Sequence, residues 1–409
     1  NSSIRYYSNP WRGRTWLGET TLATITLMMA ARSVQKLFQS LRPRIVGQAR
    51  GVSSRLISGP HRSYSSAILG TIAVGVAGYG AYKYCKNGTL GVFNPVQVQT
   101  VSAAGIPQAQ PSVWTETKEH ALFLWIELNP KVDGKMVAKV AASLPKMVDK
   151  ITDPSMRDEK DEILAGVGFG SRFYKQIGGK AKKDYTYVAR KGTNGELPSS
   201  AGDIFIHAKS NTHGKLFELA QSFLNELPKG SVKNAEETYS FEYKINRDLS
   251  GFIDGTENPA EEKHRQNVAV ETETGGSYVL TQKWIHDMDT INRTKVPILE
   301  SWIGRTRADS TELKNKPITA HIARVTGGNA FQNPKAFEIV RQSMPYGTVA
   351  GPAGLFFIAY AASPENHNFM LNRMVGRTKD ENDDIMLMSR NVKGTFWYFP
   401  GVDELKRFA

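Results

Sequence analysis

Apolar side chains in the last three quarters of the chain follow two spacings in turn. Ala121–Leu128 is an almost unbroken apolar run, which predicts a buried strand. The residues after it are apolar at every third or fourth position, as on one face of a helix: Met136, Val140, Leu144 and Met147. Further strands are predicted at Ile163–Gly170, Asp203–Ala208 and Ser240–Tyr243, with a helix carrying Leu216, Leu219, Phe223 and Leu227 before the last of them. This order is that of a ferredoxin-like unit.

A second unit of the same kind is predicted from Gly276 onward. Its strands are expected at Tyr278–Leu280, His321–Val325, Leu355–Tyr360 and Thr395–Phe399, with a helix around Phe369–Val375. The regular strand and helix count of a TIM barrel is missing, and no sequence repeat links the halves. The pattern predicts an α+β fold of two ferredoxin-like halves, residues 113–250 and 251–409, packed as one domain.

The N-terminal region has a different composition. No Asp or Glu occurs between Thr20 and Thr115, whereas Arg and Ser recur, which is typical of an organelle targeting peptide. We interpret residues 1–64 as a mitochondrial leader, with plastid import or a disordered tail as alternatives. Since the chain begins with Asn1, Met28 or Met29 is a candidate start, with the residues before it untranslated.

An uncharged segment follows this leader. Ser63–Tyr82 is a run of 20 residues without charge, and as a helix it would extend about 30 Å, enough to cross a bilayer. We therefore predict a transmembrane helix at residues 65–86, anchored in the inner mitochondrial membrane, and a linker at residues 87–112. The alternative is a buried or flexible Gly/Ala-rich part of the leader.

The net charge of +13 does not indicate nucleic-acid binding. The first 111 residues hold twelve basic residues and one acidic residue, whereas the remaining 298 hold 40 and 38. The C-terminal body is thus almost neutral, and no nucleic-acid partner is expected. A single cysteine, Cys85, excludes an intrachain disulfide and a Cys-rich metal site.

Three polar motifs stand out in the second half. Asp254 lies between two glycines in Gly251–Gly255, where the backbone can approach a bulky ligand closely. His321 lies in an apolar segment, and Arg341 follows 20 residues later. Taken singly, each has an ordinary explanation: a turn or a calcium-binding cluster with Glu257 and Asn258, a buried core histidine, or a structural ion pair.

Together these motifs resemble the dye-decolorising peroxidases, most closely the B-type bacterial members. The resemblance covers roughly Val113 to Pro400 and also includes the stretches Trp302–Thr306 and Arg341–Gly347. It implies a heme b peroxidase with two ferredoxin-like halves in a dimeric α+β barrel-type arrangement, and hydrogen peroxide and an organic electron donor, aromatic or porphyrin-like, as substrates. A homo-oligomer is a further expectation from the resemblance.

The resemblance also implies roles for individual residues. His321 matches the proximal iron ligand, Asp254 the distal acid–base residue and Arg341 its distal partner. Asp384 matches a carboxylate that accepts the other N–H of the proximal imidazole, although its acidic neighbours Glu381 and Asp383 leave this alignment open by one residue. The remaining cofactor-contacting positions are Gly251, Ile253, Gly255, Thr256 and Ser343.

The chemistry of a peroxidase requires these residue types. A neutral imidazole leaves one face of the iron open, and a carboxylate behind the imidazole raises its basicity. On the open face, a base must move a proton between the two peroxide oxygens, and a guanidinium can stabilise developing negative charge. Two other functions are kept as alternatives: a heme-handling protein without catalysis, and a structural component of a membrane complex.

Overall fold

The computed structural model describes residues 107–152, 162–326, 337–376 and 381–409, all within one compact unit, Gln99–Ala409. The predicted leader and membrane helix, and the linker up to residue 106, lie outside the described residues. Among the described helices, none combines the length and the apolar character needed to cross a bilayer.

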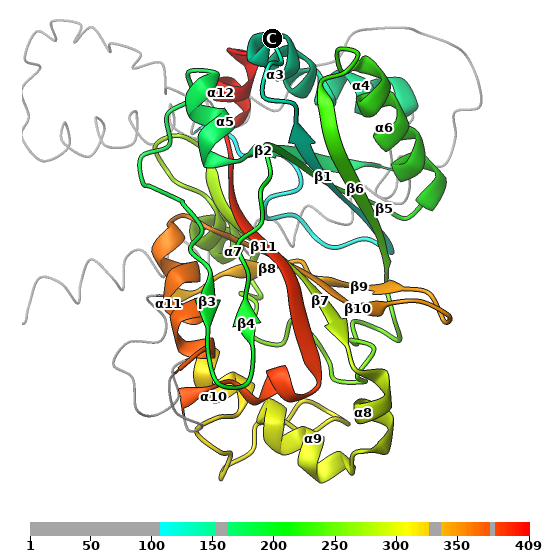
Figure 1. Ribbon diagram of the computed structural model, residues 1–409, viewed down its shortest axis with the longest axis vertical. Coiled ribbons are helices and arrows are strands. Elements are labelled where there is room, and N and C mark those ends of the chain that lie inside the picture. The colour runs from blue at the N-terminus through cyan, green and yellow to red at the C-terminus, as the bar shows by residue number, and fades with distance from the viewer. Residues whose placement is uncertain (1–106, 153–161, 327–336, 377–380) are drawn as a thin grey trace, which may run out of the picture. The chain divides into compact units, whose positions relative to one another are not determined.

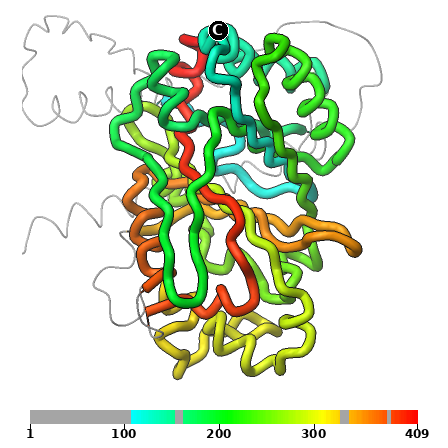
Figure 2. The backbone as a smooth tube through the Cα atoms, in the orientation of Figure 1, coloured from blue at the N-terminus to red at the C-terminus, as the bar shows by residue number. Residues whose placement is uncertain are grey.

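The N-terminal half alternates strands and helices in the predicted order (Figure 1). Its elements are β1 (His120–Leu128), α3 (Gly134–Ala142), α4 (Leu144–Ile151), β2 (Leu164–Phe169), α5 (Ser171–Gln176), β3 (Arg190–Lys191), β4 (Glu196–Leu197), β5 (Ile204–Ser210), α6 (His213–Glu226) and β6 (Val232–Phe241). The four long strands pair in the order β2-β5-β1-β6, all antiparallel. This βαββαβ arrangement is ferredoxin-like. Figure 2 shows the β3–β4 hairpin running beside the C-terminal strand, where Ser200 donates a backbone hydrogen bond to Gly394.

The C-terminal half repeats this topology with longer connections. Its elements are α7 (Glu262–Ala269), β7 (Ser277–His286), α8 (Met288–Arg293), α9 (Val296–Ile303), α10 (His321–Val325), β8 (Val340–Arg341), β9 (Met344–Gly347), β10 (Ala353–Ala361), α11 (Pro364–Met374), the 3-10 helix η4 (Asp384–Leu387), β11 (Ser389–Phe399) and α12 (Val402–Lys406). The order β11-β7-β10-β9 again has the first strand of the half beside its last. The short β8 also pairs with β10.

The two four-stranded sheets join into a closed ring. Tyr398 of β11 pairs with Phe169 of β2, and Ser240 of β6 pairs with Tyr346 of β9. Every long strand other than β2 and β6 contributes one face to an apolar cluster inside this ring. The cluster stacks aromatic rings from both halves, as at Phe123 and Phe356, whose ring centroids are 4.1 Å apart. The predicted α+β fold with two ferredoxin-like halves is confirmed.

Two sequence predictions need correction. The apolar segment His321–Val325 is a helix and not a strand. A run of five residues is too short to distinguish the spacing of apolar residues in a helix from that in a buried strand. The predicted linker ends earlier than residue 112, because Gln110 is buried and its side-chain amide bonds to Val167 and Pro400 of the folded body. The uncharged composition that suggested a linker includes a segment that is bonded to β2 through Gln110.

Candidate active site

A large cavity lies on the face of the C-terminal sheet that points away from the ring interior. Its empty volume, including the mouth, is about 1210 Å³. Leu280 and Trp284 of β7 and Leu355 and Phe357 of β10 form the sheet side, and α10, α11 and the loop after Ser250 form the other walls. The lining is mostly apolar, and the predicted residues Ile253, Asp254, Gly255, Thr256, His321 and Arg341 all contribute to it. A cavity of this size and character suits a large, flat, mostly apolar ligand.

His321 begins α10 and is oriented by a buried carboxylate. Its Nδ1 lies 2.8 Å from Oδ2 of Asp383, which is fully buried, while the His321 side chain is 24% exposed. Since a carboxylate accepts, Nδ1 carries the proton and Nε2 keeps its lone pair. The second carboxylate oxygen of Asp383 accepts from the backbone N–H of Ile385, which caps η4. The imidazole is therefore held in the tautomer that binds a metal ion through Nε2.

The partner of His321 is Asp383 and not the predicted Asp384. Asp384 turns to the other side of the chain and accepts from the Thr319 hydroxyl at 2.6 Å. Burial and the charge of neighbouring Asp383 raise the pKa of Asp384, against the hydrogen bond from Thr319. Because η4 begins directly after Asp383, only that carboxylate both caps the helix and reaches His321.

A strained turn carries Asp254 across the cavity from α10. Lys244, Ile245 and Asn246 all have positive φ angles of 45° to 56°, which is costly for residues other than glycine. The carbonyl of Asn246 accepts from the backbone N–H of Asp254 at 2.8 Å, and one carboxylate oxygen of Asp254 accepts from the N–H of Gly255. The turn thus fixes the backbone of Asp254, whose second carboxylate oxygen makes no hydrogen bond within the described residues.

Asn258 joins this loop to the strand of Arg341. Its side-chain amide donates to the carbonyl of Arg341 at 2.7 Å and accepts from the Arg341 N–H at 2.9 Å. The Arg341 guanidinium makes no hydrogen bond or ion pair within the described part of the chain, so its donors are available to a ligand. The sequence suggested Asn258 only as a member of a calcium cluster, and the described residues hold no group of three or more His, Cys, Asp or Glu suited to a metal ion.

Asp254 and Arg341 also line a second, more polar hollow of about 670 Å³. Ser343 lines this hollow and not the large cavity; its hydroxyl accepts from the N–H of Ile358. Gly251 does not line the large cavity either. Its φ is 89°, and any side chain at this position would collide with the Arg307 guanidinium, which explains why glycine is needed there. The structure therefore places neither Ser343 nor Gly251, both predicted to contact the cofactor, in the lining of the large cavity.

A buried polar network forms another part of the cavity wall and has no counterpart in the sequence predictions. His286 Nε2 lies 2.9 Å from Asp248, and its Nδ1 lies 2.7 Å from the Ser389 hydroxyl. Burial raises the pKa of Asp248, but the His286 charge and the hydrogen bonds from His286 and Ser250 outweigh this and hold it below its usual value. These residues are spread over three elements, which no local sequence pattern connects.

Family models match almost the whole body of the chain. The model for the N-terminal domain of Dyp-type peroxidases matches residues 110–242, and that for the C-terminal domain matches residues 245–404. The chain belongs to the Dyp-type peroxidase family. It is thus a heme peroxidase that uses hydrogen peroxide, which decides against a heme-handling or purely structural role.

Individual relatives agree with this assignment. The dye-decolorizing peroxidase of Mycolicibacterium paratuberculosis is 30% identical over 313 residues, covering 73% of this chain and 86% of the relative. A dye-decolorizing protein from V. cholerae has a similar structure, with a TM-score of 0.66, 30% identity, and coverage of 73% of this chain and 99% of the other. A DypB variant from Rhodococcus jostii RHA1, solved in complex with heme, has a TM-score of 0.65, 26% identity, and coverage of 73% and 98%.

Proposed function

We propose that His321 would hold heme b through Nε2 and that Asp254 and Arg341, in the wall of the same cavity, act on hydrogen peroxide. The observation that carries this proposal is the His321–Asp383 pair at 2.8 Å in the wall of a large apolar cavity that Asp254 and Arg341 also line. Bound heme would supply the iron at which peroxide is reduced by two electrons. The apolar lining fits the porphyrin faces, and the lone pair of Nε2 fits the metal.

Asp254 acts as the base in this proposal. Its open carboxylate oxygen takes a proton from one peroxide oxygen and returns it to the other as water leaves. Arg341, whose donors are unpaired within the described residues, stabilises the negative charge that develops as the oxygen–oxygen bond breaks. Asp383 keeps the proton on Nδ1 of His321 throughout and raises the basicity of the ligand.

The polar hollow beside Asp254 and Arg341 provides a path for peroxide. The hollow and the cavity share both side chains, so a small polar molecule in the hollow meets Asp254 before it meets the apolar cavity. The electron donor has different requirements. We expect an aromatic or porphyrin-like donor, as the resemblance to the dye-decolorising peroxidases implies, because the apolar cavity itself is assigned to heme in this proposal.

The test is stopped-flow absorption of the heme-loaded full chain mixed with hydrogen peroxide, beside Asp254→Asn and Arg341→Ala. We expect the heme spectrum to change rapidly in the unaltered protein and at least about a hundredfold more slowly in either variant, the usual size of an acid–base or charge-stabilising contribution. A variant that binds heme normally and reacts at the unaltered rate would remove that residue from the mechanism.

The location of the protein is part of the same proposal. We infer import into mitochondria by residues 1–64 and anchoring in the inner membrane by residues 65–86, from the acid-poor, Arg- and Ser-rich composition and the uncharged run of the sequence. Import of the full chain into isolated mitochondria, followed by alkaline carbonate extraction, tests both. Release into the supernatant would contradict the anchor. Light scattering of the purified chain tests the expected homo-oligomer.

A further inference from the structure

The strained turn that holds Asp254 carries an apolar residue in an unfavourable place. Ile245, at the centre of the turn, has a φ of 56° and is 84% exposed. A β-branched residue rarely adopts a positive φ, and glycine would be less costly there. The N–H of Asp254 bonds to the carbonyl of Asn246, which does not require an apolar side chain at position 245. The strain and the exposure together point to a contact that Ile245 makes beyond its own chain.

Two further exposed apolar side chains lie close to this turn. Val296 and Ile298, at the start of α9, are 42% and 45% exposed. Lys244 of the turn and Val296 of α9 line the same open hollow, of about 790 Å³ including its mouth. Nine large apolar side chains are exposed among the described residues, and these three belong to two short segments beside one hollow. We refer to Ile245, Val296 and Ile298 as the apolar rim.

The hollow beside the apolar rim is cationic. Its charged lining consists of Lys244, Arg247 and Arg307 and of one acid, Glu300, which accepts from the backbone N–H of Arg307 at 2.8 Å. Arg247 donates to three backbone carbonyls and to no carboxylate. In the part of the chain that the structure describes, Lys244 contacts only the ring of Tyr243, and the Arg307 guanidinium makes no hydrogen bond or ion pair. Positive charge in the hollow therefore exceeds negative charge.

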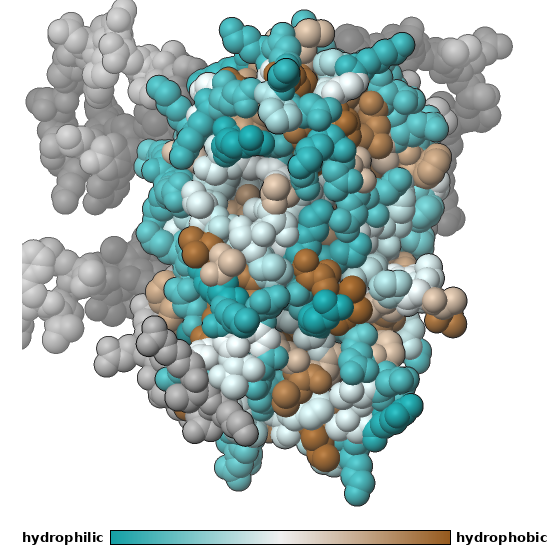
Figure 3. Space-filling model, in the orientation of Figure 1, coloured by the Kyte–Doolittle hydropathy of each residue, from teal (hydrophilic) through white to brown (hydrophobic). Residues whose placement is uncertain are grey.

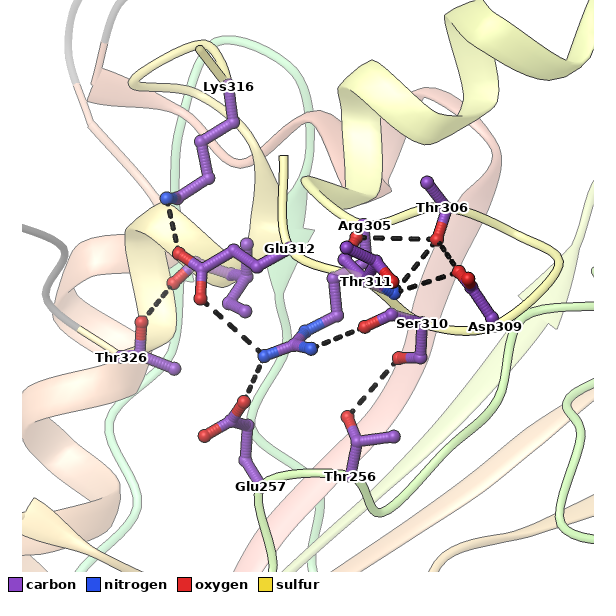
Figure 4. Close-up of polar contacts among 11 residues, drawn as sticks. Thr256, Glu257, Arg305, Thr306, Asp309, Ser310, Thr311, Glu312, Lys316 and Thr326 are labelled. Carbon is purple, nitrogen blue, oxygen red and sulfur yellow. Dashed lines mark hydrogen bonds and ion pairs between the residues drawn. The ribbon is translucent and has the colours of Figure 1, made fainter. Parts of the chain in front are cut away.

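The turn that presents Arg307 is held on both sides. Within it, the N–H of Thr311 donates to the Thr306 hydroxyl at 2.8 Å, and the N–H of Thr306 donates to the carbonyl of Thr311 (Figure 4). From the side of the hollow, Arg247 donates to the carbonyl of Arg307 at 2.7 Å. The backbone of Arg307 thus has a fixed position in the wall, next to the strained turn of Ile245.

We propose that this face docks on an anionic phospholipid bilayer, with a headgroup phosphate in the hollow and the apolar rim among the acyl chains. Exposed aliphatic side chains beside Lys and Arg are typical of surfaces that bind such membranes. A small anion in solution would fill the hollow and leave the rim in water. A second copy of the chain is a poorer partner, because a symmetric pair would bring the cations of the two copies together.

Docking goes beyond the proposed anchor and does not depend on heme binding. Residues 87–106, between the proposed anchor and the described body, can span at most about 70 Å. A compact unit of about 300 residues is about 50 Å across, so this length allows the face to reach the bilayer. Tyr243 and Arg247 also line the polar hollow beside Asp254. Docking would therefore bring the approach to Asp254 close to the membrane surface.

The experiment places a fluorescent label on the rim of the full chain. Cys85→Ser removes the single native thiol, so Ile245→Cys then takes one environment-sensitive fluorophore. On vesicles of phosphatidylglycerol and phosphatidylcholine we expect a blue shift of the emission and quenching by a lipid-borne quencher, and on phosphatidylcholine alone neither. Phe217→Cys, at a 52% exposed apolar position of α6, is the matched control and should not shift.

Charge variants test the hollow in the same labelled chain. Lys244→Gln and Arg307→Gln should each lower the equilibrium constant for docking about fivefold, the usual effect of one cation near an anionic bilayer. The constant is taken from the shift at increasing phosphatidylglycerol content. Lys229→Gln, at an exposed position after α6, should leave the constant unchanged.

The outcomes separate docking from the anchor and from catalysis. No shift at position 245 on anionic vesicles would overturn docking, and so would an equal shift on neutral vesicles or at position 217. A shift that appears without vesicles and grows with protein concentration would show that a second copy covers the rim instead. A chain that carbonate releases but that still shifts on anionic vesicles would retain docking and lose the anchor. The peroxide reaction is measured separately and decides neither.

Discussion

The two halves of the ring have the same strand order but treat their outer faces differently. In the N-terminal half, α3, α4 and α6 cover the sheet, and Leu122, Leu124 and Ile126 of β1 are fully buried beneath them. In the C-terminal half, the matching face of β7 and β10 is left partly uncovered by α10 and α11 and lines the cavity. The two sheets are alike, and the halves differ in how completely the helices in their connections cover the outer face of the sheet.

The connections that follow β7 and β10 in the C-terminal half place short helices and polar side chains beside the cavity. The crossover after β7 ends with the five-residue α10 and His321, and the crossover after β10 ends with η4 and Asp383. Both lie at the end of the unit opposite to α3 and α4, as Figure 1 shows. A repeated fold has thus kept one half for stability and opened the other for chemistry. The face drawn in Figure 3 is mostly hydrophilic, with apolar side chains in separate groups.

The largest effect on heme affinity should come from removing the imidazole of His321, which begins α10 in the C-terminal half. We expect His321→Ala to lower heme affinity by more than about a hundredfold, because the iron loses its only protein ligand in the proposal. Hemin titration measures this. His264→Ala, on the exposed face of α7, is the control, and an equal loss there would point to a general effect of histidine removal.

The helices α6 and α11, which lie in the last connection of each half, should contribute differently to the pH dependence of stability. The buried face of α6 is apolar, whereas α11 buries His367, whose Nε2 donates to the carbonyl of Tyr278. Burial lowers the pKa of His367 to about 4, against about 6.5 in the unfolded chain. The unfolded chain therefore binds more protons between these values, and the free energy of unfolding should fall by up to about 3 kcal/mol as the pH drops from 6.5 to 4.

Urea unfolding at pH 7.5 and pH 5 measures this slope. In His367→Leu the slope should decrease but not vanish, because burial also lowers the pKa of His207, in β5 of the other half. An unchanged slope in His367→Leu would mean that another group carries the acid sensitivity.

Two neighbouring carboxylates give a sharper test of the His321 side. Asp383→Asn should lower heme affinity about tenfold to a hundredfold, because the amide does not supply the charge that keeps Nδ1 protonated and Nε2 basic. Asp384→Asn is the matched control and should have little effect, since Asp384 contacts Thr319. The opposite ranking of the two variants would restore the original alignment of the motif.

The smallest effect is expected across the cavity. Asn258→Ala removes both hydrogen bonds that join the Asp254 loop to Arg341, so the reaction with peroxide should slow about tenfold while heme binding is retained. Stopped-flow measurement beside Asn267→Ala, an exposed asparagine of α7, provides the comparison. An unaltered rate would show that the two residues are positioned independently.

Long apolar runs made most of the fold predictable. The runs at Ala121–Leu128 and Leu355–Tyr360 became β1 and β10, because a strand buried on both faces needs continuous apolar residues. The same reasoning was wrong for the five-residue α10. Its helical state depends on Arg324 and Thr326 bonding back to Ala320 and Ile322, which a short apolar pattern does not reveal.

The site was predictable where one residue type has one chemical use. The motifs and the family resemblance pointed to His321, Asp254 and Arg341, and the structure places all three in the wall of one cavity. The choice between Asp383 and Asp384 stayed open and Asn258 was given no such role, because these depend on partners 62 and 83 residues away. Such partners are known only once the chain has folded.

The closed ring also constrains the order of events during folding. Its last strand, β11, pairs with β7 and closes onto β2 through a single residue pair, and Asp383 lies in the segment just before that strand. Contacts between segments far apart in the sequence form late in folding, and the pairing of β11 with β2 and β7 requires that residues 389–399 have been synthesised. A chain that is still being synthesised, or still crossing a membrane, therefore lacks a complete cavity, and lasting incorporation of the cofactor belongs to the finished polypeptide.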